Sequence, residues 1–191
     1  MVDKTEALDL VLSRRSLSPR FLIAPTPTPE ELALILRAAA AAPDHKNLKP
    51  YRFILIPTER RGDLAAVFRE AKAERDPGAS ATEIERAGEK AYRGAMLLAV
   101  VLRIVRDHPR VSVTDQVLAA GAAIENMLLA ASALGYAGCL RSGNSATSRR
   151  VRLALGIANE EELAAFLMLG TPAKAPSPRD EEAADLLSIW E

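Results

Sequence analysis

The sequence predicts one globular domain that contains both helices and strands. Of its 191 residues, 49% are hydrophobic and 26% are charged, so the chain is long and apolar enough to bury a core. Several segments place apolar residues at helical spacing, and others are short runs of aromatic and β-branched residues typical of strands. We find neither an internal repeat nor a clear linker, and therefore expect residues 1–191 to form a single domain.

Two helices are predicted before the first strand. Residues 5–15 place their large apolar side chains on one helical face, and Ser18-Pro19 ends that pattern. The second helix has Thr28 as its N-cap, Pro29 at the first helical position and Glu31 three residues after the cap, which together form a capping box. Its apolar stripe is Leu32, Ile35, Leu36 and Ala39, and Pro43 ends it.

A strand and a highly charged segment follow. Tyr51–Ile56 is rich in aromatic and β-branched residues between two prolines, which predicts a strand. Residues 60–93 have helical spacing and are interrupted at 76–78, with a second capping box formed by Ser80 and Glu83. We expect two solvent-facing helices here, either ordinary surface helices or a mobile cover over a site.

The remaining elements are predicted from apolar runs and their boundaries. The longest helix is apolar nearly all round, which indicates enclosure by the rest of the protein or by a second subunit. In chain order we expect a strand buried on both faces (96–105), this long helix (113–134) closed by Gly135, a short strand or turn (139–143), a helix (148–155), a last strand (166–169) and an extended tail that wraps a surface (173–188).

Charge and cysteine content narrow the class of protein. Lys plus Arg and Asp plus Glu both total 25, and this zero net charge argues against a dedicated nucleic-acid binder. Cys139 is the only cysteine, which excludes an intramolecular disulfide and favours a reducing compartment. Charged residues interrupt the N-terminus, unlike a signal peptide, and Glu125 and Asn126 interrupt the longest apolar stretch. We therefore expect a cytoplasmic protein that does not enter a membrane.

Most catalytic signatures are absent from the sequence. Neither His45 nor His108 has the spacing of a metal ligand, and one cysteine without clustered histidines gives no zinc site. There is no nucleophile elbow, phosphate-binding P-loop or dinucleotide fingerprint. The sequence has groups that can bind a ligand, but no recognisable catalytic acid, base or nucleophile. Such a protein can use the chemistry of a bound cofactor.

The residues that could bind a ligand form three clusters in the sequence. Arg14-Arg15-Ser16 offers two guanidinium groups and a hydroxyl, a set that suits phosphate, although cations at a helix C-terminus also simply complement the helix dipole. Residues 43–51 form a donor-rich connection that is either a site or an ordinary polar loop. Arg141-Ser142 repeats the Arg-Ser pair after the long helix, and the sequence leaves open whether both pairs meet at one anion.

These clusters, taken in order, resemble the flavin-dependent nitroreductases. That family has a double-Arg-Ser triplet near its N-terminus and an Ala-Pro-x-x-x-Asn-x-x-Pro-aromatic segment after the second helix, which correspond here to residues 14–16 and 42–51. Residues 121–135 are similar to its long central helix, and residues 166–172 to its closing strand and Gly-x-Pro turn. Asp-His-Lys at 44–46 and Leu-Arg-Ser-Gly at 140–143 are closest to the small bacterial YdjA-type members.

The resemblance implies an FMN enzyme that takes hydride from NADH or NADPH and reduces a second substrate by a ping-pong cycle. It implies an α+β fold, with a mixed, mainly antiparallel central sheet flanked by helices, in a homodimer with FMN at the interface and a C-terminal segment that embraces the partner. By position, Arg14, Arg15 and Ser16 would hold the FMN phosphate, ribityl chain and ring edge. Leu140, Arg141 and Ser142 would line the same side, and Pro43, His45 and Asn47 would face them, His45 from the other subunit.

Three positions depart from the relatives that the sequence resembles most. Leu140 stands where they tend to carry Trp, Tyr51 where Trp is common, and Ala41 where Arg can occur. The substrate could therefore differ, for example an enone, a halogenated aromatic or flavin itself. An alternative from another class is a flavin-binding module for storage, sensing or delivery with little turnover, and a purely structural helical protein is a further one. The sequence selects neither the physiological acceptor nor NADH over NADPH.

Overall fold

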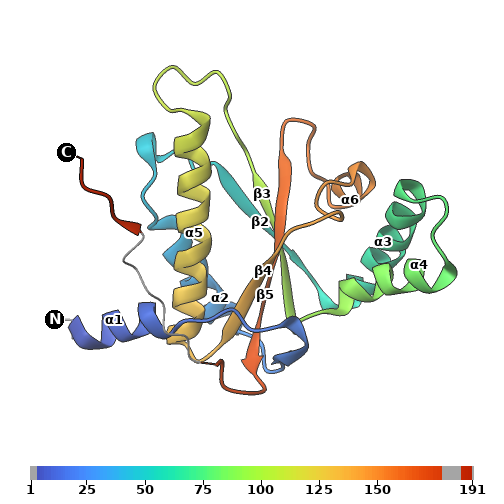
Figure 1. The fold of residues 1–191 in the computed structure, drawn as a ribbon, viewed down its shortest axis with the longest axis horizontal. Helices are drawn as coiled ribbons and strands as arrows, with labels where there is room; N and C mark the ends of the chain where they lie inside the picture. The colour runs from blue at the N-terminus through green and yellow to red at the C-terminus, as the bar shows by residue number, and fades with distance from the viewer. Residues whose placement is uncertain (1–3, 178–185, 191) are drawn as a thin grey trace.

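An antiparallel sheet between two layers of helices organises the chain (Figure 1). The computed structural model describes residues 4–177 and 186–190. Within these residues five strands pair in the order β1-β5-β3-β2, and β4 also pairs with β5. All of these pairings are antiparallel, in agreement with the predicted α+β class. The strands are β1 (Leu22–Ile23), β2 (Tyr51–Ile56), β3 (Met96–Leu102), β4 (Ala137–Arg141) and β5 (Glu162–Pro172).

The central strand β3 divides the hydrophobic core into two parts. Its residues from Met96 to Val101 are all buried, which confirms the prediction of a strand covered on both faces. Because side chains alternate along a strand, Leu97, Ala99 and Val101 enter one core cluster, while Met96, Leu98 and Val100 enter the other. Each face of the sheet therefore needs its own layer of helices.

The first layer consists of α3 (Arg61–Arg75), α4 (Ala81–Gly88) and α6 (Arg149–Ala154). The sequence prediction of two helices in residues 60–93 is confirmed, and so is the capping box of Ser80 and Glu83. The expectation that both face solvent is wrong for α3, since Leu64, Ala65 and Phe68 are buried against the sheet. The high charge of this segment concealed these apolar residues, which recur at helical spacing.

The second layer consists of α1 (Lys4–Ser13), α2 (Pro29–Ala40) and α5 (Val113–Ala133). The predicted capping box of Thr28 and Glu31 begins α2, and a further one formed by Ser112 and Asp115 begins α5. Part of this layer does not contact the sheet: Leu8, Val11 and Leu12 of α1 are each more than half exposed. Their common face is therefore not buried within this chain.

The remaining differences from the predicted elements are at boundaries. β5 starts four residues before the predicted strand, and β4 covers 137–141 in place of 139–143. The two-residue strand β1 was not predicted, because its short sequence acquires strand geometry only by pairing with the end of β5. Short 3-10 helices complete the chain: η1 (Pro19–Phe21), η2 (His45–Asn47), η3 (Thr58–Arg60) and η4 (Glu89–Tyr92).

The predicted tail, residues 173–188, lies partly outside the described residues. Ala173 still pairs with the core, since its backbone N–H donates to the Phe21 carbonyl at 2.9 Å. The described end of the chain lies on the side of α1 and α5 in Figure 1. Its large apolar side chains are almost entirely exposed: Leu186, Leu187, Ile189 and Trp190.

Candidate functional site

The Arg14-Arg15-Ser16 triplet directly follows α1, which ends at Ser13. The next residue, Leu17, is buried, and its backbone N–H donates to the Gly138 carbonyl on β4 at 3.2 Å. Gly138 is itself closely packed, because a Cβ there would lie 2.7 Å from the side chains of both Leu128 and Leu169. The triplet is therefore fixed at the junction of α1, α5 and the sheet.

A cavity of about 560 Å³ opens beside this triplet. Its volume lies within the range of about 300–1,000 Å³ that is common for ligand sites. Cationic and hydroxyl side chains dominate its lining, and no carboxylate is among the described residues that line it. These side chains are Arg14, Arg15, Arg20, Lys174, Ser16, Ser18 and Ser177.

Arg14 has donors available for a ligand. Its Nε lies 2.7 Å from a carboxylate oxygen of Glu125 on α5, an ion pair without the alignment of a hydrogen bond. Both Nε and Nη1 of Arg14 are buried and make no hydrogen bond to the described residues. Buried donors without acceptors are costly, so an anion beside Arg14 would be stabilised by completing them.

Arg20 and Lys174 are held beside the same cavity by an aromatic ring. The Arg20 guanidinium carbon lies 4.6 Å from the centre of the Phe21 ring, and Lys174 Nζ lies 4.4 Å from it. Cation–π attraction fixes these otherwise mobile side chains. The pairing of β1 with β5 brings the two segments together, through Leu22 and Pro172.

The predicted residues Pro43, His45 and Asn47 are not brought to this cavity within one chain. All three are exposed. His45 lies near the first turn of α5: hydrogen bonds to Ser112 lower the pKa of Asp115, and nearby His45 adds a smaller electrostatic effect in the same direction. Asp115 and the Arg14 partner Glu125 are separated by about 15 Å along α5, at a rise of 1.5 Å per residue.

The connection that carries His45 has an unusual backbone. Lys46, Asn47 and Lys49 have φ values of 65°, 53° and 48°, in the left-handed region that residues other than glycine rarely adopt. The loop is secured by Asp44, whose Oδ2 accepts from the Lys49 backbone N–H at 2.7 Å. Such strained positions concentrate at functional sites, so the geometry favours a functional role for this loop over an ordinary connection.

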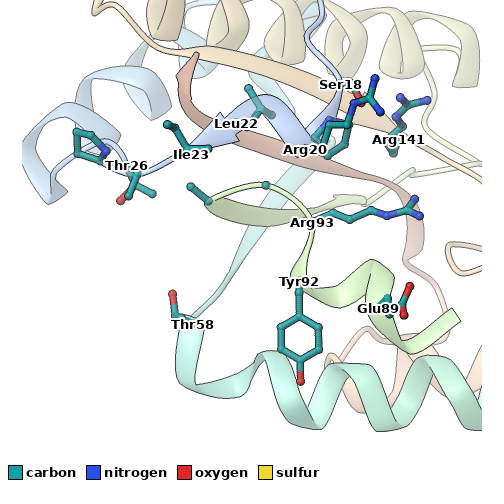
Figure 2. A pocket seen from close by; sticks show the side chains of 15 residues that line it. Ser18, Arg20, Leu22, Ile23, Thr26, Thr58, Glu89, Tyr92, Arg93 and Arg141 are labelled. Carbon is teal, nitrogen blue, oxygen red and sulfur yellow. The ribbon is translucent and has the colours of Figure 1, made fainter. Parts of the chain in front are cut away.

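The residues Leu140, Arg141 and Ser142 lie at the end of β4 and just after it. All three are exposed, and Leu140 is 40% exposed. The Arg141 side chain lines a different and larger cavity, of about 1,130 Å³, together with Ser18 and Arg20 (Figure 2). Ser18 and Arg20 line both cavities, so the cavity of Arg141 adjoins the cavity of Arg14.

Sequence reasoning missed Ser18, Arg20, Lys174 and Arg93 as candidate site residues. Ser18 and Arg20 follow the triplet closely, and this proximity could have identified them. Lys174 gave no such signal, because the unpredicted pairing of β1 and β5 is what brings it to the cavity. Among the described residues, no three His, Cys, Asp or Glu side chains are grouped so that they could hold a metal ion.

Comparison with known proteins places this geometry in a family. A family model described as "Nitroreductase family" matches residues 11–171. The YdjA protein of Escherichia coli K12, which carries the provisional name of NAD(P)H nitroreductase, is 36% identical over 167 residues, or 87% of this chain and 88% of YdjA. The predicted similarity to YdjA-type proteins is thus confirmed.

Solved structures share the fold over the whole chain. A nitroreductase-like protein from Bacillus cereus has a TM-score of 0.82 at 20% identity and covers 100% of this chain and 99% of its own. A protein from Desulfovibrio desulfuricans, solved in complex with FMN, has a TM-score of 0.73 at 24% identity, with coverages of 100% and 99%. The matched family model and the extended identity to YdjA show that this chain belongs to the nitroreductase family.

Proposed function

We propose that the chain is an FMN-dependent oxidoreductase that takes hydride from NADH or NADPH and reduces a small-molecule acceptor such as a nitroaromatic or a quinone. One observation carries the proposal: in a nitroreductase-family chain, Arg14-Arg15-Ser16 lines a cavity whose other charged side chains are also cations. The FMN complex of the D. desulfuricans protein and the NAD(P)H in the name of YdjA support the choice of cofactor and reductant. Residues 1–191 would then be one FMN-binding domain.

The residues of the smaller cavity fit the phosphate of FMN. A phosphate dianion needs several donors and compensating positive charge, and guanidinium groups supply both. Arg14 has two buried nitrogens without hydrogen bonds, and Ser16 adds a hydroxyl. Arg15 and Lys174 add positive charge to the same cavity. These residues would bind and orient the cofactor.

The other part of the flavin site would come from a second copy of the chain. The loop that contains Pro43, His45 and Asn47 lies near the first turn of α5, and none of the three lines the cavity beside Arg14 in the same subunit. We infer a homodimer in which this strained loop faces the Arg14 cavity of the partner. The exposed state of all three residues in the single chain agrees with that role.

The exposed apolar side chains of the second layer support the same dimer. Val117 and Leu118 on α5 are 46% and 65% exposed, and the apolar face of α1 is also open. Several large exposed apolar side chains on the helices of one layer are typical of an interaction surface. The exposed C-terminal residues 186–190, of which Trp190 is fully exposed, would embrace the partner.

The chain's own residues would prepare the site for electron transfer. FMN, when bound, would supply the chemistry by accepting a hydride in one half-reaction and donating electrons in the next, which gives a ping-pong cycle. Leu140 would exclude water from the site, and the donor at Ser142 would stabilise negative charge that develops on reduction. Arg141 would lie beside the flavin, where its side chain lines the adjoining larger cavity. No side chain is required as a nucleophile in this scheme.

The proposed partners are small molecules and a second subunit, and the proposed location is the cytoplasm. Zero net charge argues against nucleic acid as a partner. Of the helices in the described part of the chain, α5 is the one long and apolar enough to span a membrane. Its buried residues, including Ala123 and Met127, pack in a core cluster with the sheet, so we interpret it as a core helix and propose no membrane contact.

The direct test is the visible spectrum of the purified protein with FMN, followed by anaerobic addition of NADPH or NADH. We expect a tightly bound flavin whose absorbance near the visible maximum bleaches with the reductant and returns with a nitroaromatic or a quinone. Arg14→Ala should lose flavin retention while unfolding at nearly the same temperature. Failure of the wild-type protein to take up flavin would refute the proposal, and flavin uptake without turnover would identify a binding module.

A further inference from the structure

We propose that the larger cavity is a second anion site, which binds the phosphate or carboxylate group of a substrate separately from the FMN phosphate. The presence of the site follows from the cavity itself. Its assignment to a substrate rests on the proposed function. Figure 2 shows Arg20, Arg93 and Arg141 on one side of this cavity, with the guanidinium groups of Arg20 and Arg141 next to each other, and Leu22 and Ile23 on the other side.

The charges that line this cavity are not neutralised within the chain. None of its three arginines forms an ion pair with a described carboxylate, and Glu89 is the one acidic residue in the described lining. Three guanidinium groups around one space repel one another, and an anion among them removes that repulsion. The excess of positive charge also acts locally, since partial desolvation and the charge of Arg93 lower the pKa of Lys90.

Arg93 is presented by a segment that the protein fixes with a buried cation. The Arg61 side chain, in a residue only 4% exposed, donates to the Ala91 carbonyl at 2.8 Å and to the Ala95 carbonyl at 3.3 Å. It thereby holds both ends of the segment that carries Arg93. Between them Gly94 has a φ of 70°, and a Cβ there would lie 2.9 Å from Met168, so the turn is closely packed on β5.

Arg61 also adds positive charge behind the wall of the cavity. It has no carboxylate partner among the described residues, and burial lowers its pKa. Burying a guanidinium without an opposite charge costs free energy, and hydrogen bonds to carbonyls offset only part of that cost. Placed next to the Arg93 segment, its charge makes the cavity still more attractive to an anion.

The shape of the lining indicates what kind of anion binds. The arginines provide planar donor forks, which match phosphate and carboxylate oxygens. Leu22, Ile23 and Pro25 provide an apolar surface beside them. A volume of about 1,130 Å³ is more than one inorganic ion needs. These features fit an organic molecule with an anionic end, either a phosphorylated reductant such as NADPH or an acceptor that carries a carboxylate.

Binding of inorganic pyrophosphate to the FMN-saturated protein tests the anion site without turnover. Saturation with FMN fills the proposed cofactor cavity, and Arg93 lines only the larger of the two. Isothermal titration calorimetry should show binding that Arg93→Gln weakens by about tenfold or more, the effect of losing one charge-assisted hydrogen bond. Arg93→Lys, which keeps the charge but loses the fork, should weaken binding less.

Arg86→Gln is the matched control for this measurement. Arg86 is exposed on α4, seven positions before Arg93, and does not line the cavity. Its replacement removes the same charge and should leave pyrophosphate binding unchanged. Equal binding by wild type and Arg93→Gln, at normal FMN retention, would overturn the anion site while leaving the proposed function intact. Equal weakening by both substitutions would also overturn it, because the effect would then be general electrostatics.

Steady-state kinetics distinguish the two sources of the anion. If the 2′-phosphate of the reductant is the anion, Arg93→Gln should raise the KM for NADPH about tenfold and leave that for NADH unchanged; if the diphosphate is the anion, both KM values should rise. If the acceptor carries it, the KM for 4-nitrobenzoate should rise and that for neutral 4-nitrobenzyl alcohol should not. If neither KM changes, the assignment of the site to a substrate is wrong.

Discussion

The two helical layers on either side of the sheet differ in how much of their apolar surface is buried, and how many of their charges are paired, within one chain. In the first layer, α3 and α4 leave none of their large apolar side chains exposed, and Arg150 of α6 pairs with Glu70 and Glu74 of α3. The second layer leaves apolar faces of α1, α2 and α5 open. It also holds strained backbone around Asn47 and unfilled donors on Arg14.

This contrast separates a layer that completes the fold from a layer that prepares for binding. Ion pairs and buried apolar residues stabilise the first layer without a second subunit or a ligand. The second layer places exposed apolar area beside buried Arg14 nitrogens that make no hydrogen bond to the described residues, a combination that costs free energy unless another subunit and an anionic ligand cover it. We therefore expect substitutions in the second layer to act mainly on assembly and cofactor binding.

The largest effect should follow from Leu118→Glu. Leu118 is 65% exposed on α5, so a single subunit tolerates a charge there. At a subunit interface, however, an unpaired buried carboxylate costs about 3–5 kcal/mol. We expect dissociation to monomers in analytical ultracentrifugation, with loss of bound flavin.

Leu153→Glu is the matched control, because Leu153 is 54% exposed on α6 in the first layer. It should leave the oligomeric state and the flavin content unchanged. If both variants behaved alike, the claim that only the second layer takes part in dimer formation would be wrong. If Leu118→Glu remained dimeric, α5 would be excluded from the interface.

A smaller effect, confined to the fold of the subunit, should follow from Glu161→Gln. Glu161 accepts two hydrogen bonds from Arg52 on β2, at 2.7 and 2.6 Å, and these lower its pKa from 4.5 to about 2. After allowance for solvent screening around Arg52, whose side chain is 31% exposed, the pair should contribute about 1–2 kcal/mol at pH 7. Urea unfolding at fixed protein concentration measures this difference.

The pH dependence of the same pair has a definite sign. Because the folded pKa is below the unfolded one, the stabilisation is complete above about pH 4.5 and is lost as the pH falls toward 2. The gap in unfolding free energy between wild type and Glu161→Gln should narrow over that window. A gap that stayed constant with pH would show that the carboxylate charge contributes nothing.

The smallest effect should come from Ser112→Ala at the start of α5. Ser112 Oγ accepts from the Asp115 backbone N–H at 3.0 Å, and Asp115 Oδ2 accepts from the Ser112 backbone N–H at 3.1 Å. Loss of such a cap costs about 1 kcal/mol. Thermal unfolding should show this modest loss, while the dimer and its flavin persist. Loss of flavin from this variant would mean that the end of α5 acts on the site directly.

Much of the fold could be predicted because local sequence determines it. The start of α2 followed from Thr28 and Glu31, and the buried strand β3 followed from its uninterrupted apolar run. The short strand β1 could not be predicted, since two residues carry no periodicity and their geometry depends on β5. The buried face of α3 was missed because charged residues are interspersed with the apolar ones along the helix.

Only those parts of the candidate site whose residues are adjacent in the sequence could be predicted. The Arg14 triplet could be recognised as a unit because its members are adjacent. The positions of Arg20 and Lys174 around Phe21 depend on contacts between distant segments, which spacing does not reveal. The sequence left open whether Arg141 and Arg14 meet at one anion, and in the structure the Arg141 side chain lines the adjoining larger cavity. The direction in which a side chain points at the end of a strand depends on the sheet register, and the sequence does not give that register.

The central claim is that each flavin site combines Arg14 of one subunit with the His45 loop of the other. Subunit complementation tests it most directly. Arg14→Ala and His45→Ala are expressed together with different affinity tags, and the mixed dimer is purified through both. FMN bound per dimer is then measured by absorbance, with each parent homodimer as control.

We predict that each parent homodimer retains little flavin, because both of its sites carry a lesion. In the mixed dimer, one site carries both lesions and the other none, so it should bind one FMN per dimer with the affinity of the wild-type protein. A mixed dimer that binds no more flavin than its parents would contradict the account, because it would mean that Arg14 and His45 act in the same site of one subunit.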